Sequence, residues 1–251
     1  MKKFLYLLPI IFLSIIPISP PLNNTSYNDK ASIMTTSLSD SSIKFMSKEI
    51  QSKDSFLELN LKYPVLSGLE NKAKQDQINA VFKNYIDKIS NEMKKCSLKN
   101  SKNNTENQTP LTPYTATTDF EVKHIGKSII SLYINYYQYT GGAHGMHGKK
   151  PFNFDLTSGR QLELKDIFKI GTDYKKLLSV EIEKQMKQKQ VHYFDDAAYT
   201  IKSLPNTQPF YFTNTGIVIY YGLYEITPYA DGPQEFTIPY DYVKDYLIVS
   251  P

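Results

Sequence analysis

The fold is decided by the stretch Ser55-Phe56-Leu57-Glu58-Leu59-Asn60-Leu61-Lys62-Tyr63 and by the different pattern that follows it over residues 70–96. In the first stretch apolar and polar side chains alternate from Leu57 to Tyr63. An extended chain turns successive side chains to opposite faces, so this alternation predicts a half-buried strand. Pro64 and Gly68 predict where the strand ends.

The hydrophobic period changes directly afterwards. Within residues 70–96 apolar side chains recur every three or four positions, at Ile78, Phe82, Tyr85, Ile89 and Met93. This spacing predicts an amphipathic helix of several turns. The polar residues 99–113 that come next predict a loop.

The rest of the chain returns to strand patterns with one further helix. Residues 120–124 and 128–140 predict a hairpin with its turn at Gly126-Lys127, and residues 152–164 predict a second hairpin. A helix from Thr172 or Asp173 to about Gln190 precedes strands at 210–212, 217–221 and 236–238, and a helical turn from Tyr240. This order predicts an α+β fold, in which an antiparallel sheet packs with two main helices, with room for two intimate subdomains.

The N-terminus predicts export. Met1-Lys2-Lys3 precedes an apolar run, Phe4 to Ser19, that Pro9 and Pro17 interrupt. A membrane-spanning helix needs about 20 apolar residues. Residues 1–20 are therefore expected to be a signal peptide or an uncleaved signal anchor, and residues 21–42 a flexible linker. We expect an extracellular or cell-surface protein that contacts the membrane only through an uncleaved anchor.

Composition narrows the function. The formal net charge is +4 with a single arginine, Arg160, which is unlike the clustered basic surface of a nucleic-acid binder. Cys96 is the only cysteine, so an intrachain disulfide is excluded. The sequence contains none of the common nucleophile, phosphate-loop or dinucleotide motifs. We therefore predict no cofactor and no catalytic residue, and favour a binding protein over an enzyme.

Two loops carry the candidate site. In Gly141-Gly142-Ala143-His144-Gly145-Met146-His147-Gly148, His144 can hydrogen-bond the backbone of a tight connection, contact a ligand, or join His147 at a metal. Zinc needs three or four ligands and no further Cys or His is near in sequence, so we predict no metal.

The second loop, Gly222 to Pro233, contains Tyr224, Pro228 and Tyr229. Tyrosine offers a large contact area at low entropic cost, and proline stiffens a loop before binding. These features favour a recognition surface. The alternative is that both tyrosines pack the loop onto the sheet.

The residue blocks in these regions resemble a known family. The blocks are Tyr139 to Gly145, Phe154 to Gly159, Leu162-x-Leu164-x-Asp166-Ile167-Phe168 and Tyr224 to Pro233. In this order they are similar to the paired extracytoplasmic domains of PdaC-like and RsiV-like proteins, over roughly residues 43–250. The resemblance implies a PdaC-like subdomain over 43–140 and an RsiV-like subdomain over 141–251.

The resemblance also implies partners. RsiV-like domains sense lysozyme by binding it, and PdaC-like domains precede a peptidoglycan deacetylase domain in a supposed wall-binding role. If the RsiV-like behaviour carries over, Pro228 and Tyr229 are the contacts, with Tyr224 behind them. Because so little precedes the apolar segment and residue 251 ends the chain, we expect neither a sigma-binding part nor a deacetylase part.

We therefore predict an exported, non-catalytic binding or sensing module at the cell envelope. It would recognise a cell-wall glycan or a lysozyme-like protein through Tyr224, Pro228, Tyr229 and His144. The alternative is an exported hydrolase that acts on wall glycan or peptide through His144 and His147, with or without a metal.

Overall fold

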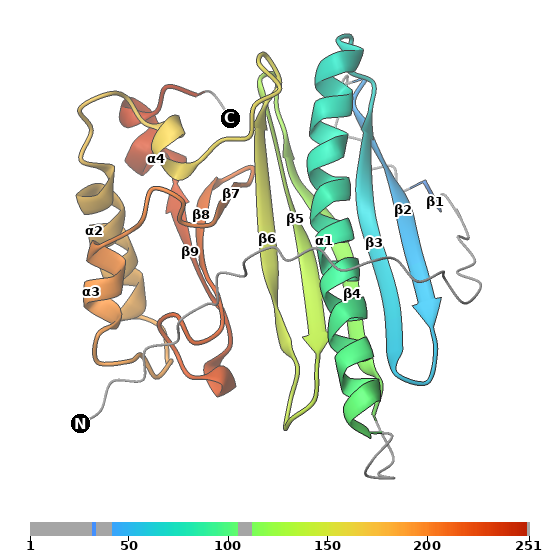
Figure 1. Cartoon of the computed structure of the whole chain (residues 1–251). Coiled ribbons are helices and arrows are strands. Elements are labelled where there is room, and N and C mark those ends of the chain that lie inside the picture. Colours follow the sequence, from blue (N-terminus) through green and yellow to red (C-terminus); the bar gives the residue numbers. More distant parts are fainter. Residues whose placement is uncertain (1–31, 34–41, 105–111, 250–251) are drawn as a thin grey trace.

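The computed structural model describes residues 32–33, 42–104 and 112–249. The predicted signal segment and most of the predicted linker lie outside these residues. Two sheets with strand orders β1-β2-β3-β4-β5-β6 and β7-β8-β9 form the framework, which confirms the α+β class (Figure 1). The larger sheet contains β1 (Ser32–Ile33), β2 (Lys44–Lys53), β3 (Leu57–Ser67), β4 (Tyr114–Ile125), β5 (Ile129–Tyr139) and β6 (Met146–Asp155).

One helix covers a face of the larger sheet. α1 (Lys72–Asn104) connects β3 to β4 and carries the chain back, so these two strands pair in parallel, with Leu57 opposite Tyr114. All other strand pairs among the described residues are antiparallel. Fully buried Phe82 of α1 meets the rings of Phe152 and Phe154 edge-on, with centroids 5.4 and 5.5 Å away. Edge-on aromatic pairs of this kind add to the stabilisation from burial alone.

Two predicted boundaries in this part were wrong. β3 runs through Pro64 to Ser67. At that point β3 pairs with β2 on one side only, because its pairing with β4 stops at Leu61, and proline is tolerated where no ladder donor is needed. α1 continues beyond the expected end at Cys96 into the predicted loop. Residues 97–104 contain no glycine or proline that would end a helix, although they lack an apolar stripe.

The second module packs on the other face of the larger sheet. It contains α2 (Tyr174–Met186), α3 (Ala197–Lys202), β7 (Phe210–Phe212), β8 (Gly216–Tyr221), β9 (Gln234–Pro239) and α4 (Tyr240–Val243). Asp173 caps α2 by accepting from the Lys176 amide, as predicted, although the helix ends at Met186. In Figure 1 the smaller sheet lies beside β5 and β6, with α2 and α3 on its far side.

Residues 141–164 depart from the sequence pattern. Met146, His147 and Gly148 belong to β6 and not to a glycine-rich loop. The predicted hairpin over 152–164 reduces to one bridge between Phe154 and Gln161, because the chain then leaves the sheet and buries Leu164 and Ile167 in the second core. The predicted subdomain boundary at 140/141 falls in the loop between β5 and β6 and stays a prediction. Within residues 42–104 and 112–249, no helix is long and apolar enough to cross a membrane.

A buried polar joint connects the two modules. Ser131 of β5 donates to Asn153 Oδ1 of β6 at 2.6 Å and accepts from the Phe212 amide at 2.8 Å. Asn153 Nδ2 donates to the Phe210 carbonyl at 2.7 Å. Ser131 and Asn153 are almost fully buried. Because an unpaired buried polar group is costly, this joint fixes where β7 meets the larger sheet.

Replacing Ser131 tests the joint. Ser131→Ala leaves the Phe212 amide without its partner, so we expect the free energy of unfolding to fall by about 1–3 kcal/mol in urea denaturation. Ser203→Ala, at the exposed end of α3, should change it by less than about 0.5 kcal/mol. Equal stability of the two variants would show that the joint contributes nothing.

His124 gives the fold a pH dependence. It packs against Phe212 of the second module, with ring centroids 6.3 Å apart, and burial lowers its pKa below the ordinary 6.5, opposed by the Asn214 side chain. The unfolded chain therefore binds more protons as the pH falls below 6.5, and stability is lost in that direction. Urea denaturation between pH about 7.5 and about 5 should show this loss. In His124→Gln the loss should shrink, and an unchanged slope would contradict this assignment.

Candidate functional site

The two loops singled out by the sequence meet in space. His144, in the loop between β5 and β6, stacks its ring on Tyr229, with centroids 3.8 Å apart and planes 23° from parallel. The ring of His147, at the start of β6, meets the Tyr229 ring edge-on, with centroids 5.8 Å apart. The centroids of the Tyr224 and Tyr229 rings are 5.9 Å apart. These four residues, His144, His147, Tyr224 and Tyr229, are called the His–Tyr cluster below.

Hydrogen bonds fix the relative position of the rings. The Tyr229 hydroxyl donates to the Gly145 carbonyl at 3.0 Å, and His144 Nδ1 lies 3.2 Å from the same oxygen. A carbonyl only accepts, so we assign the proton of the neutral imidazole to Nδ1. Nε2 then accepts from the Tyr224 hydroxyl at 3.3 Å. The backbone hydrogen bond expected for His144 is therefore present, together with a contact to the second loop.

Glycines shape the loop between β5 and β6. Gly141 and Gly142 have φ values of +94° and +91°, which favour glycine, and the Tyr139 hydroxyl donates to the Gly142 carbonyl at 3.1 Å. A Cβ on Gly145 would stand 2.5 Å from the Tyr137 ring. Only glycine therefore allows Tyr137 to pack against this turn.

The loop from Gly222 to Pro233 is closed by its own hydrogen bonds. Buried Thr227 donates from Oγ1 to the Gly232 carbonyl at 2.7 Å, and Gln234 donates to the Asp231 carbonyl at 2.8 Å. Pro228 is half-buried and precedes a 3₁₀ turn over Tyr229–Asp231. These bonds order the loop before any partner arrives, which lowers the entropic cost of binding.

Backbone strain and exposed apolar surface coincide at this loop. Tyr224 has φ +64° and is the only non-glycine residue with a positive φ in the described ranges. Such a conformation costs on the order of 1–3 kcal/mol and concentrates at functional sites. Tyr224 is 49% exposed, and Met146 and Tyr137 beside the loops are 42% and 38% exposed. The arrangement presents a preformed aromatic surface suited to a partner.

The structure places the rings of three of the four predicted site residues, His144, Tyr224 and Tyr229, in one cluster. The fourth, Pro228, directly precedes Tyr229 in the chain. His147 is close to them through Tyr229. In the part of the chain that the structure describes, no group of three or more His, Cys, Asp or Glu side chains is placed to hold a metal ion. The hydrolase alternative stays a prediction.

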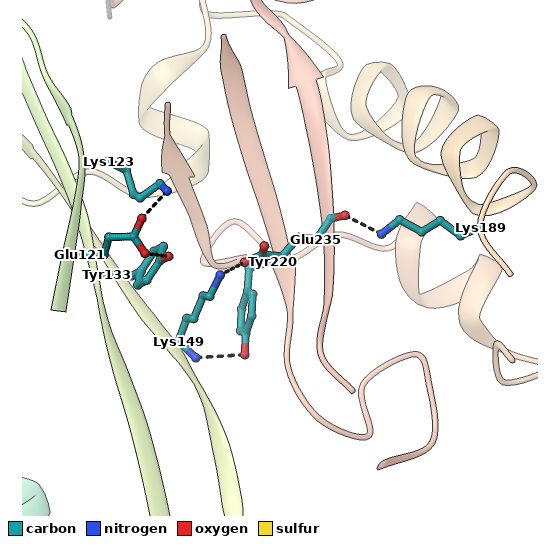
Figure 2. Close-up of polar contacts among 7 residues, drawn as sticks. All are labelled: Glu121, Lys123, Tyr133, Lys149, Lys189, Tyr220 and Glu235. Carbon is teal, nitrogen blue, oxygen red and sulfur yellow. Dashed lines mark hydrogen bonds and ion pairs between the residues drawn. The ribbon is translucent and has the colours of Figure 1, made fainter. Parts of the chain in front are cut away.

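The sequence did not reveal a polar cavity between the modules. Its volume is about 700 Å³, and residues from β5 and β6 form one wall while residues from β8, β9 and the segment after α2 form the other. Figure 2 shows Lys149 and Lys189 on opposite sides of Glu235. Lys149 Nζ pairs with Glu235 Oε1 at 2.7 Å, and Lys189 Nζ donates to the Glu235 carbonyl at 2.7 Å. Lys149 and Glu235 are 86 positions apart, so no local pattern connects them.

The same polar chain extends into the larger sheet (Figure 2). The Tyr133 hydroxyl donates to the Glu121 carboxylate, and Lys123 Nζ forms an ion pair with Glu121 Oε1 at 2.6 Å. Burial opposes the charged form of Glu121, yet the hydrogen bonds from Lys123 and Tyr133 hold its pKa below the usual range. Burial and these contacts with Glu121 raise the pKa of Tyr133. The Lys149 ammonium lies 4.4 Å from the centre of the Tyr133 ring, a cation–π contact that continues the chain toward Glu235.

Comparisons with known proteins divide the chain in two. The model of the family described as deacetylase PdaC matches residues 50–147, and that of a family of unknown function, DUF3298, matches residues 165–241. The peptidoglycan-N-acetylmuramic acid deacetylase PdaC of Bacillus subtilis is 31% identical over 51% of this chain. That match spans only 28% of PdaC's own length. The anti-sigma-V factor RsiV of Bacillus subtilis is 27% identical over 80% of this chain and 69% of its own length.

Solved structures share the fold of most of this chain. A DUF3298 family member from Bacteroides fragilis is 26% identical, with a TM-score of 0.58, and the match covers 84% of this chain and 97% of that one. A DUF3298 family protein from Pseudomonas aeruginosa, 16% identical with a TM-score of 0.52, shares the fold over 83% of this chain and 95% of its own. This chain therefore carries the PdaC-like and RsiV-like pair of domains, a PdaC domain over residues 50–147 and a DUF3298 domain over residues 165–241.

Proposed function

We propose that the chain is an exported, non-catalytic recognition module at the cell envelope, whose His–Tyr cluster binds a lysozyme-like protein. The observation that carries this proposal is the preordered aromatic surface where the two loops meet, with His144 stacked on Tyr229 at 3.8 Å. Both loops also carry the residue blocks that resemble RsiV-like domains.

The surface has the properties of a protein-binding hot spot. Such sites are rich in tyrosine, and their aromatic side chains lose little entropy on binding because few torsions are free. Here the hydroxyls of Tyr224 and Tyr229 are already engaged with His144 and Gly145, so the rings are held before contact. Exposed Met146, between Gly145 and His147 in the chain, adds apolar surface at the start of β6.

Export is the second part of the proposal. It is supported by the basic and apolar pattern of residues 1–20 and by the relatives, a peptidoglycan deacetylase and an anti-sigma factor. The full activity of either relative is not carried over, because the match spans part of each protein. In this proposal the paired domains of this chain and of its relatives share one function, which is recognition of a partner without catalysis.

The test measures binding of the purified protein to immobilised hen lysozyme by biolayer interferometry. We expect saturable binding that Tyr229→Ala weakens by at least about 30-fold, the loss typical of a hot-spot tyrosine. Tyr224→Ala and Pro228→Ala should weaken it less. The matched control is Tyr199→Ala on α3, which is 75% exposed and belongs to no part of the His–Tyr cluster, and it should bind like the parent.

Thermal melting checks that each variant is folded, because Tyr229 also holds Gly145. A folded parent protein that does not bind lysozyme would contradict the proposed partner. Sedimentation with insoluble peptidoglycan in parallel identifies the other predicted partner, wall glycan. Loss of binding in Tyr199→Ala as large as in Tyr229→Ala would remove the His–Tyr cluster from the interface.

A further inference from the structure

The cavity between the modules has the chemistry of a ligand site; it borders the His–Tyr cluster at His147 but is lined by none of His144, Tyr224 and Tyr229. It is about 700 Å³ in volume, within the range of small-molecule sites, and such sites often lie between domains. Its lining is almost free of aliphatic side chains. A ligand that enters a polar cavity must replace the hydrogen bonds of the water that it displaces. The lining therefore favours a hydroxyl-rich molecule.

Lys189 is the cation in this cavity that forms no close ion pair with a described residue, although the Glu235 carboxylate acts on it electrostatically. Its ammonium donates to two neutral oxygens, the Glu235 carbonyl at 2.7 Å and Gln234 Oε1 at 3.4 Å, and lies 4.4 Å from the centre of the Phe236 ring. Among the described residues it forms no ion pair, whereas Lys149 is paired with the Glu235 carboxylate. A half-buried cation whose hydrogen bonds all go to neutral oxygens favours an anionic ligand group.

Two tyrosine hydroxyls converge at Gly148 on the wall of this cavity. A Cβ on Gly148 would stand 2.7 Å from the Tyr136 hydroxyl and 2.8 Å from the Tyr220 hydroxyl, so glycine leaves room for both. The Tyr220 oxygen accepts from the Lys149 amide at 3.0 Å, and its own proton has no acceptor among the described residues. Neither the Tyr136 hydroxyl nor the Asn135 amide, both on the cavity wall, hydrogen-bonds a described side chain or carbonyl. Three polar groups are therefore free to bind hydroxyls.

We propose that this cavity binds an acidic oligosaccharide, with a carboxylate at Lys189 and sugar hydroxyls at Tyr136, Tyr220 and Asn135. The length of the ligand follows from a second hollow of about 300 Å³ that shares Asn135 and Tyr136 with the cavity and continues over β3 and β4. Lys62 lines that second hollow and forms no ion pair with a described residue, so it provides a site for the next carboxylate. A chain of uronic acid units offers one carboxylate to Lys189 and another to Lys62, in two hollows that also contain the acidic residues Glu235 and Asp119.

Calorimetric titration of the purified protein with tri-galacturonic acid tests this proposal, with neutral maltotriose as the matched ligand. We expect saturable binding of the acid at least about tenfold tighter than that of maltotriose, and weaker binding as salt is raised. Lys189→Met should weaken binding at least about tenfold, and Lys189→Arg should restore most of it. Lys62→Met should weaken binding of the trimer but not of galacturonic acid itself.

Controls separate this site from the proposed function. Lys176→Met, in a different hollow, should bind the trimer like the parent. Tyr229 contacts His147 but does not itself line the cavity, so Tyr229→Ala should lose lysozyme and keep the trimer, and the failure of one proposal is distinguishable from the failure of the other. If Lys189→Met does not fold, Tyr136→Phe removes one hydroxyl only and should weaken binding several-fold. No trimer binding by the folded parent, or equal binding by Lys189→Met, would overturn the inference.

Discussion

Ser131 and Asn153 point from the larger sheet into the smaller module, and every feature of the candidate site depends on the place at which they hold β7. The two side chains satisfy each other and two backbone groups of β7 in a region that is almost inaccessible to solvent. A sliding or rotated interface would leave these groups unpaired, so the interface has one low-energy position. That position brings the loop at Tyr229 onto the loop at His144 and creates the cavity between the sheets.

The interface combines this fixed joint with looser polar contacts around it. Lys149 lies between Glu235 and the Tyr133 ring, and it links charges on β4, β6 and β9 in one chain. Such contacts at a partly exposed rim add little stability by themselves, but they exclude wrong arrangements because like charges would meet. The buried amide of Asn153 and hydroxyl of Ser131 fix the orientation of the two modules. The contacts at the rim supply the polar lining of the cavity between them.

The sequence predicts those helices and strands in which the hydrophobic pattern repeats over several turns or several strand positions. Leu57 to Tyr63 and Ile78 to Met93 have clear periods because one face of each is buried in the same core. The start of β6 lacked a readable pattern, since Gly145 and Gly148 give room to Tyr137, Tyr136 and Tyr220 and so resemble loop residues. The end of α1 was missed for a related reason, because polar residues without a buried face leave no period to read.

The candidate site shows the same limit. His144, Tyr224 and Tyr229 were found because unusual residues concentrate in two loops, and a family resemblance reinforced them. Lys189, Glu235 and Asn135 look like ordinary solvent-facing residues far apart in the sequence, and only the tertiary arrangement puts them around one cavity. Pairings over 86 positions of chain are set by the fold and leave no trace in local sequence.

The contact of Tyr220 with the Lys149 amide has a consequence for the solubility of the chain. β6 is the last strand of the larger sheet, and an uncovered last strand offers a row of amides and carbonyls to any other extended chain. Here the Tyr220 hydroxyl accepts a hydrogen bond from the Lys149 amide, and the Leu162 amide donates to the Asn153 carbonyl. Gln161 forms a β-bridge with Phe154. The second module therefore also acts as a cover for this edge, and a chain cut between the modules would expose a template for aggregation.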